Sequence, residues 1–259
     1  MNLPLLIVIA VVLGLLVGSF LTVVVERVPA GGSVMAPPSR CDSCGLRLGP
    51  LDLIPVASWV VLRGKCRRCG VPIGARVMVI ELATMALFVL FALEFEDDVA
   101  VVIAYWILAA TLVAQTAIDL ETQRLPRTIT YTALVIGAVA LTVAALAVDE
   151  PERIWMSALG AAIALAIMWL IYALSRGCMG DGDVRFAPLL GMYLGWINPG
   201  IVAPGLFFGF IAGAVVGLTM MVANRAGRRT ALPFGPFMAA GTVIAIFEGQ
   251  AFVDLVMQR

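Results

Sequence analysis

Long blocks of apolar residues are the feature that most restricts what this chain of 259 residues can fold into. A helix of about 20 apolar residues crosses a bilayer, and only helices or closed barrels satisfy their backbone groups inside one. The chain is 62% hydrophobic and 13% charged, with a mean hydropathy of +1.04, which leaves too little polar surface for a soluble protein. The blocks fall at roughly 3–25, 78–93, 99–118, 129–148, 154–174, 184–196, 200–223 and 232–247. The sequence therefore predicts an all-α polytopic membrane protein with about eight transmembrane helices.

The sixth block, 184–196, is the weakest of the eight. At 1.5 Å per residue it would be only about 20 Å long as a helix. We expect it to be tilted, half-buried in protein or re-entrant, which leaves six or seven spans as alternatives. The first block is expected to be an uncleaved transmembrane helix, because no basic segment precedes it and no clear small-x-small cleavage site follows it.

Charge is segregated between the loops although the formal net charge is zero. Residues 26–77 contain eight basic and three acidic residues, and an excess of Lys and Arg is typical of cytoplasmic loops. The turn at 94–98 is acidic and is expected to face outside, and a last basic loop contains Arg225, Arg228 and Arg229. Eight spans with both termini outside satisfy the sign of every loop. A net charge of zero gives no support for nucleic-acid binding.

Two CxxC pairs lie in the segment 26–77. They are Cys41 with Cys44 and Cys66 with Cys69, separated by 21 residues, and a glycine follows each pair. Four thiolates at this spacing complete a tetrahedral zinc site, which is structural because no ligand position is left open. A redox pair or unligated cysteines are the alternatives, and a reducing cytoplasm argues against two structural disulfides. The chain is thus expected to comprise a first transmembrane helix (1–25), a cytoplasmic zinc-binding insert (26–77) and a membrane-embedded bundle (78–259).

The absence of histidine narrows the chemistry that the chain could carry out. It excludes His-Glu zinc-protease motifs and Ser-His or Cys-His nucleophiles. The single lysine, Lys65, lies among the cysteines, which disfavours a Ser-Lys dyad. No phosphate-binding loop of the GxxxxGK[ST] or GxGxxG type is found. If the chain is an enzyme, its acid–base groups are therefore carboxylates.

Asp119 ends the third apolar block, and Asp183 opens the sixth. The chain crosses out and back between them, so both are expected at the same membrane face. A carboxylate at the edge of hydrocarbon indicates function by default, and two carboxylates that share a proton can activate water without histidine. The alternative is that both are solvated helix caps, with Asp183 as an N-cap. Asp181 is the weaker candidate, interpreted as a solvated loop residue.

An ordered set of motifs along nearly the whole chain resembles the prepilin peptidase family, the leader peptidases and N-methyltransferases of type IV pilus and type II secretion systems. The opening GSFLTVV carries Thr22 where the family has Asn, and Cys178, Arg185 and Arg127 are further departures. The other matching motifs are PPSRC, IPVASW, LRGKC, IEL, the Leu-Pro after Asp119, the GxGD loop that ends at Asp183, and LPFGPF at 232–237.

This resemblance implies a role for each candidate residue. Asp119 and Asp183 would be the catalytic pair of a GxGD-type intramembrane aspartic protease, and the four cysteines would bind zinc. The substrate would be a prepilin or pseudopilin whose short basic leader is cut just before its hydrophobic helix, typically after Gly. The new N-terminus would then be methylated with S-adenosylmethionine. The implied location is the bacterial inner membrane, with the active site and the zinc insert on the cytoplasmic side.

The methyl-transfer residues are not assigned by the sequence. Glu81 and Gly64 lie in matched motifs near the membrane interface, but an ion-paired glutamate and a turn glycine are equally good interpretations. Two other classes compete with the peptidase: a transporter that relays protons or cations through its aspartates, and a zinc-stapled scaffold without catalysis.

Overall fold

The computed structural model describes residues 2–175, 179–223 and 232–257. Outside the mostly irregular segment 28–75 and the short loops, the described residues are helical, and the β-structure consists of two isolated bridges, which confirms the predicted all-α class. Arg225, Arg228, Arg229 and Cys178 lie outside the described residues. The longer helices are α1 (Leu3–Arg27), α3 (Arg76–Glu94), α4 (Val99–Thr122), α5 (Arg127–Ala147), α6 (Glu152–Leu174), α7 (Asp181–Ile197), α8 (Val202–Val222) and α9 (Gly235–Met257). The short elements are α2 (Ala57–Val61) and the 3₁₀ turns η1 (Pro50–Leu53) and η2 (Pro199–Ile201).

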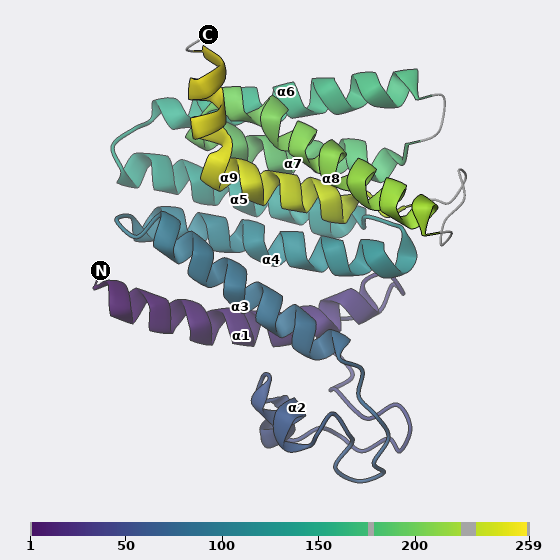
Figure 1. Ribbon diagram of the computed structural model, residues 1–259. Coiled ribbons are helices and arrows are strands. Elements are labelled where there is room, and N and C mark those ends of the chain that lie inside the picture. Colours follow the sequence, from purple (N-terminus) through teal and green to yellow (C-terminus); the bar gives the residue numbers. More distant parts are fainter. Residues whose placement is uncertain (1, 176–178, 224–231, 258–259) are drawn as a thin grey trace. The chain divides into compact units, whose positions relative to one another are not determined.

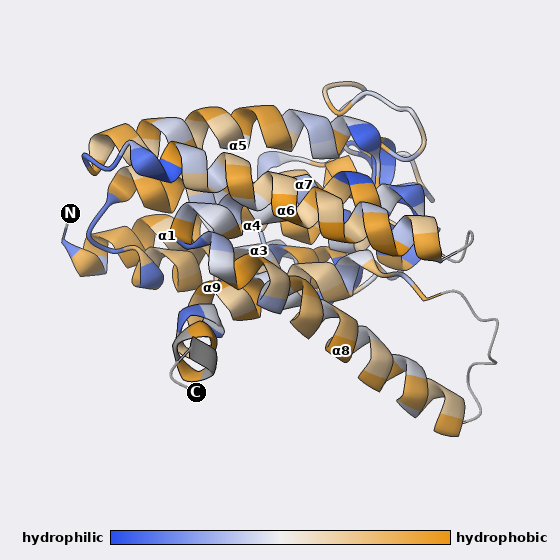
Figure 2. Cartoon of the chain, turned by 90° about the horizontal axis from the view of Figure 1, so that it is seen from above, coloured by the Kyte–Doolittle hydropathy of each residue, from blue (hydrophilic) through white to orange (hydrophobic). Residues whose placement is uncertain are grey.

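Seven of the described helices are long and apolar enough to cross a membrane: α1, α3, α4, α5, α6, α8 and α9. Figure 2 shows α6 and α8 hydrophobic along most of their length, whereas hydrophilic residues gather at helix ends and in loops. The eighth helix, α7, has 17 residues and corresponds to the weak block at 184–196. The chain is a multi-pass membrane protein.

The chain divides into two compact units, Met1–Val102 and Ile103–Arg259. In the first unit α1 and α3 lie side by side (Figure 1), and small residues allow their close approach. A Cβ added to Gly18 would lie 2.7 Å from the Cα of Glu81, so only glycine fits there. The segment between the two helices contains η1, α2 and the cysteines. The division into a first helix, an insert and a bundle remains a prediction.

The second unit is organised around α7, which packs against α5, α6, α8 and α9. Its residues from Phe186 to Trp196 are buried apart from half-buried Pro188. The α6–α7 contact is a glycine seam formed by Gly160, Gly191 and Gly195. A Cβ on Gly160 would lie 2.2 Å from the carbonyl oxygen of Gly191, so the two backbones touch. Protein rather than lipid therefore surrounds α7, one of the outcomes expected for so short a helix.

Candidate active site and metal centre

Asp119 lies in the last turn of α4, and its side chain is buried, with 4% exposed. The backbone N–H of Gly235, the first residue of α9, donates a hydrogen bond of 2.8 Å to Asp119 Oδ2. One carboxylate oxygen is thereby fixed by a neutral donor. This glycine lies 116 residues further along the chain, inside the LPFGPF motif, for which the sequence alone indicates no role.

Asp183 lies in the first turn of α7 and is half-buried. Its carboxylate interacts electrostatically with those of Asp119 and Asp181. The start of α7 therefore lies beside the end of α4, and the two aspartates singled out in the sequence come together in one unit of the fold. A Cβ on Gly180 would lie 3.4 Å from Asp183 Oδ2. A side chain at position 180 would therefore stand next to this oxygen, whereas glycine leaves the space beside it free.

Leu125 connects the segments that carry the two aspartates. It is buried, at 7% exposed, in the loop between α4 and α5. A Cβ on Gly182 would lie 3.2 Å from Leu125 Cβ, and a Cβ on Gly235 would lie 3.1 Å from Leu125 Cδ2. Leu125, in the Leu-Pro pair after Asp119, thus contacts both the start of α7 and the start of α9.

Asp181 differs from Asp183 although both lie in the first turn of α7. It is exposed and forms ion pairs with Arg185 at 2.5 Å and Arg127 at 3.6 Å. Arg185 and Arg127 are two of the positions at which the sequence departs from the family pattern, and both form ion pairs with Asp181. The structure therefore gives Asp181 a charge-pairing role at the surface and leaves Asp183 beside Asp119.

Replacing Gly235 by Ala is expected to lower the activity of the aspartate pair about 10- to 100-fold. The added Cβ would lie 2.9 Å from Asp119 Oδ2, so the carboxylate would have to move, and small displacements of catalytic groups cost factors of this order. The measurement is kcat/KM for the reaction that the resemblance implies for the aspartate pair, with thermal unfolding as a check on the fold. Gly217→Ala is the matched control, because its Cβ meets only the flexible end of Leu232. Equal rates for both variants would contradict the role given to Gly235.

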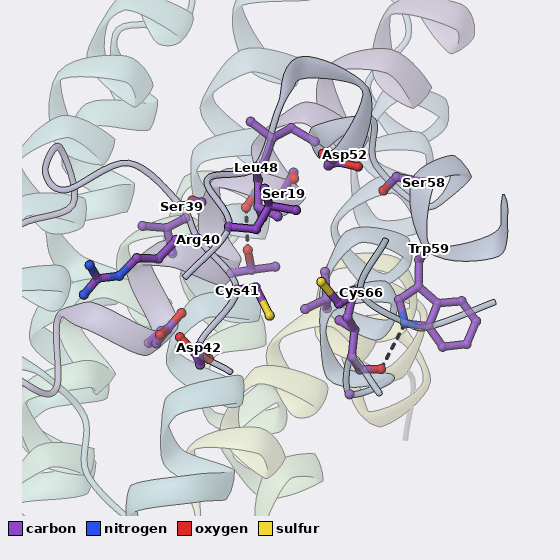
Figure 3. Close-up of a pocket in the computed structure, with 18 of the residues that line it drawn as sticks. Ser19, Ser39, Arg40, Cys41, Asp42, Leu48, Asp52, Ser58, Trp59 and Cys66 are labelled. Atoms are coloured by element: carbon purple, nitrogen blue, oxygen red, sulfur yellow. Dashed lines mark hydrogen bonds between the residues drawn. The ribbon is translucent and has the colours of Figure 1, made fainter. Parts of the chain in front are cut away.

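The four cysteines of the CxxC pairs converge. Their Sγ atoms all lie within 4.8 Å of one another, with 3.8 Å between Cys41 and Cys69 and 4.0 Å between Cys44 and Cys66. Sulfurs at about 2.3 Å from a tetrahedral zinc ion lie about 3.8 Å apart, so the two closest printed pairs have the spacing of a tetrahedral metal site. Figure 3 shows Cys41 and Cys66 with their sulfurs turned toward each other.

Each pair of cysteines belongs to the same local turn. Cys41 and Cys66 accept hydrogen bonds through their carbonyl oxygens from the N–H groups of Gly45 and Gly70, at 2.8 and 3.0 Å. Both glycines have a positive φ, near +70°, which L-residues rarely adopt. Isolated β-bridges flank the two turns, Arg40 with Arg47 and Lys65 with Pro72. The glycine that follows each CxxC in the sequence is therefore what allows the turn to close.

The thiols of this cluster are electrostatically unequal. Hydrogen bonds from the backbone N–H groups of Cys69 and Arg68 lower the pKa of Cys66 to about 6. At Cys44 the backbone N–H of Leu46 lowers the pKa, but burial and the neighbouring thiols outweigh it and raise the value to about 11. The cluster thus favours the thiolate form of Cys66 and disfavours that of Cys44. A bound cation would stabilise the thiolate form of all four cysteines, because metal ions bind deprotonated sulfur.

The two residues left open by the sequence now have defined surroundings. Gly64 has φ +65°, and a Cβ there would lie 2.8 Å from the ring of Trp59. It is thus a turn glycine that also makes room for an aromatic ring. Glu81 is buried, at 3% exposed, and accepts a hydrogen bond of 2.7 Å from the N–H of Val56 through Oε2. The printed partner of Glu81 is thus a neutral backbone donor in the segment before α2.

Comparisons with known proteins identify the family of the chain. Residues 106–220 match the type IV leader peptidase family, and residues 12–95 match the bacterial peptidase A24 N-terminal domain. The chain is 36% identical over 275 residues to the prepilin leader peptidase/N-methyltransferase of Burkholderia pseudomallei (strain 1026b), covering 95% of this chain and 87% of the relative. It is 38% identical over 232 residues to the protein of the same name from Myxococcus xanthus (strain DK1622), with 88% and 67% covered. For the Bacillus subtilis (strain 168) protein the identity is 28% over 247 residues, with 95% and 96% covered. No solved structure matches the chain.

Proposed function

Because the chain belongs to the type IV leader peptidase family, we propose that it is a prepilin leader peptidase that cuts its substrate with Asp119 and Asp183. The observation that carries this proposal is the convergence of two carboxylates from α4 and α7, with one oxygen of Asp119 held by Gly235. The names of the relatives specify a prepilin leader as the substrate and an N-methyltransferase as the second activity. The relatives' names favour this function over a transporter.

The proposed chemistry needs only the two carboxylates and water. Two carboxyl groups that repel each other share one proton, so one is ionised while the other is protonated. The ionised group takes a proton from the attacking water, and the protonated group donates to the oxygen of the scissile carbonyl. The Gly235 N–H orients Asp119 for this task. Gly182, between Asp181 and Asp183 in the first turn of α7, packs against Leu125 and so holds this turn close to the end of α4.

We further propose a location and an orientation for the substrate. A basic leader stays on the cytoplasmic side while the apolar helix that follows it lies in the bilayer. The bond to be cut would then lie at the cytoplasmic face of the inner membrane, and the charge of residues 26–77 and the parity of the spans favour the same face for both aspartates. Prepilins or pseudopilins and membrane lipid are the partners that this arrangement requires.

The metal in this proposal is structural zinc held by Cys41, Cys44, Cys66 and Cys69. Their sulfur spacing supports a closed tetrahedral site with no position for substrate. S-adenosylmethionine, when bound, would supply an electrophilic methyl group for the amine freed by cleavage.

The proposal is tested by reconstituting the full chain in lipid with a purified prepilin. We expect mass spectrometry to find a released leader and a mature product cut at a single bond before the hydrophobic helix. Adding S-adenosylmethionine should increase the mass of the mature N-terminus by one methyl group. A prepilin that stays intact under these conditions contradicts the peptidase function, whereas full cleavage without the mass increase contradicts only the methylation.

A further inference from the structure

A short apolar segment, Pro50–Leu62, lies between the two CxxC pairs of the first unit. It comprises η1, α2 and the residues that flank them, and Asp52 is its single ionisable residue. An apolar stretch of about 10–14 residues is too short to span a bilayer and is typical of a buried core element or of a segment at the membrane interface. The structure describes every residue from 50 to 62, and none of them is buried. The segment therefore has the character of an interfacial element and not of a core.

Four large apolar side chains of this segment are exposed, and we call them the apolar rim. The exposed fractions are 65% for Leu51, 45% for Ile54, 56% for Val60 and 78% for Val61. None of these four lines the cavity of about 800 Å³ that the insert forms with α1 and α3. The rim therefore belongs to the outer surface of the first unit. Apolar surface of this kind marks a contact with another protein or with a membrane.

Contacts with α1 and α3 place the segment beside these two spans. The N–H of Val56 donates a hydrogen bond of 2.7 Å to Glu81 Oε2, and Gly18 of α1 packs against the backbone of Glu81. At 1.5 Å per residue, Glu81 lies about 7 Å inside the start of α3 and Gly18 about 13 Å inside the end of α1. Figure 1 shows α2 beside the α1–α3 pair and not beyond its end. Because both helices are long and apolar enough to cross a membrane, the segment lies at the level where headgroups meet acyl chains.

The polar groups of the segment bond within the protein, as a location next to acyl chains requires. Asp52 forms an ion pair of 2.8 Å with Arg67, and only 11% of its side chain is exposed. The backbone N–H groups of Ser58, Val60 and Leu62 donate to carbonyl oxygens four residues earlier, at 2.9–3.1 Å. The surface that the segment presents is therefore formed by the side chains of the apolar rim.

We propose that Pro50–Leu62 is a membrane-surface element whose apolar rim enters the lipid leaflet at this end of α1 and α3. Arg63 and Lys65, which come just after α2 and are exposed, then lie at the level of the headgroups, where long basic side chains reach phosphate. The excess of basic residues in 26–77 matches an anionic lipid surface. Glu81 anchors the element to the spans through the N–H of Val56. The inference depends on neither leader cleavage nor methyl transfer.

The test is photocrosslinking of the full chain in nanodiscs of phosphatidylethanolamine and phosphatidylglycerol. The photoreactive residue p-benzoylphenylalanine replaces Val61 in one sample and Leu51 in another, and mass spectrometry counts the lipid adducts. Both positions should form lipid adducts about as often as the same reporter at Val8, an exposed position of the α1 span. The matched negative control is the reporter at Arg68, exposed in the second CxxC turn, which should give at least about tenfold fewer. Lipid adducts at 61 and 51 no more frequent than at 68 would overturn the proposal, as would adducts with protein in place of lipid.

A charge in the rim provides a second measurement. Val61→Asp should lower the lipid adducts of the reporter at position 51 at least about tenfold, because a carboxylate among acyl chains is costly. Met35→Asp changes a comparably exposed apolar residue of the insert outside the segment and should leave the yield unchanged. An unchanged yield in Val61→Asp would also contradict the proposal. If the reporter at position 61 prevents folding, the reporter at position 51 decides by the same criterion. A chain that crosslinks to lipid but does not cleave prepilin contradicts only the peptidase, and one that cleaves without these adducts contradicts only this inference.

Discussion

Asp183→Asn is expected to lower kcat/KM for leader cleavage at least about 10³-fold, and Asp119→Asn to do the same. Acid–base groups contribute about 10²–10⁴-fold, and each asparagine also removes the shared proton on which the partner carboxylate depends. The double variant should be no slower than either single variant, because residues that act as a unit are not additive. The measurement is cleavage of a prepilin by chain reconstituted in lipid.

Two neighbouring carboxylates serve as matched controls for these substitutions. Asp181→Asn alters a residue that is exposed and paired with Arg185 and Arg127. Glu121→Gln alters an exposed residue two positions after Asp119. Both should cleave at close to the wild-type rate. Wild-type cleavage by Asp119→Asn or Asp183→Asn would show that the aspartate mechanism is wrong.

Replacing one zinc ligand, as in Cys66→Ser, is expected to abolish metal binding and unfold the insert. Between residues 28 and 75 only Gly64 and Cys66 are buried, so the segment has almost no apolar core of its own. Segments of this kind depend on a metal or another covalent staple, and structural zinc contributes about 10–16 kcal/mol of apparent binding free energy. The zinc content should fall from about one ion per chain to near zero, and limited proteolysis should then cut within 28–75.

The fifth cysteine provides the control for this experiment. Cys178 lies far from the CxxC pairs in the sequence, so Cys178→Ser should keep the zinc and the protease resistance of the insert. Incubation of the wild type with a strong chelator should reproduce the Cys66→Ser pattern. A stoichiometry well below one zinc per chain in wild-type protein purified without chelator would contradict the four-cysteine site.

The apolar pattern predicted the helices well because hydrophobicity alone decides which segments enter a bilayer. The block 78–93 became α3 at Arg76–Glu94. The block 99–118 corresponds to α4, which extends further, from Val99 to Thr122. Asp119 therefore lies in the last turn of the helix and not beyond its end. Polar residues at a span end continue the backbone hydrogen bonds of the helix, so hydropathy underestimates its length.

Contacts between distant segments could not be predicted in the same way. Nothing local to Gly235 indicates that its N–H reaches Asp119, because the bond depends on where α9 starts relative to the end of α4. The spacing of the CxxC pairs did predict the convergence of the cysteines, since each turn fixes two sulfurs locally. The surroundings of Glu81 could not be predicted either, because its partner, the N–H of Val56, belongs to the loop before α2 and is a neutral backbone group that no sequence pattern marks.

The glycine seam between α6 and α7 has a consequence for how the protein is made. With 17 residues and with Asp181, Asp183 and Arg185 near its start, α7 is a poor substrate for lateral release from a translocon. Gly160, Gly191 and Gly195 bring its backbone against that of α6, which emerges from the ribosome first. α7 is thus expected to insert into the bilayer together with α6, as the second helix of a helical hairpin. Asp183 then reaches its final depth only after synthesis has passed this hairpin, and α9 brings Gly235 to Asp119 last of all.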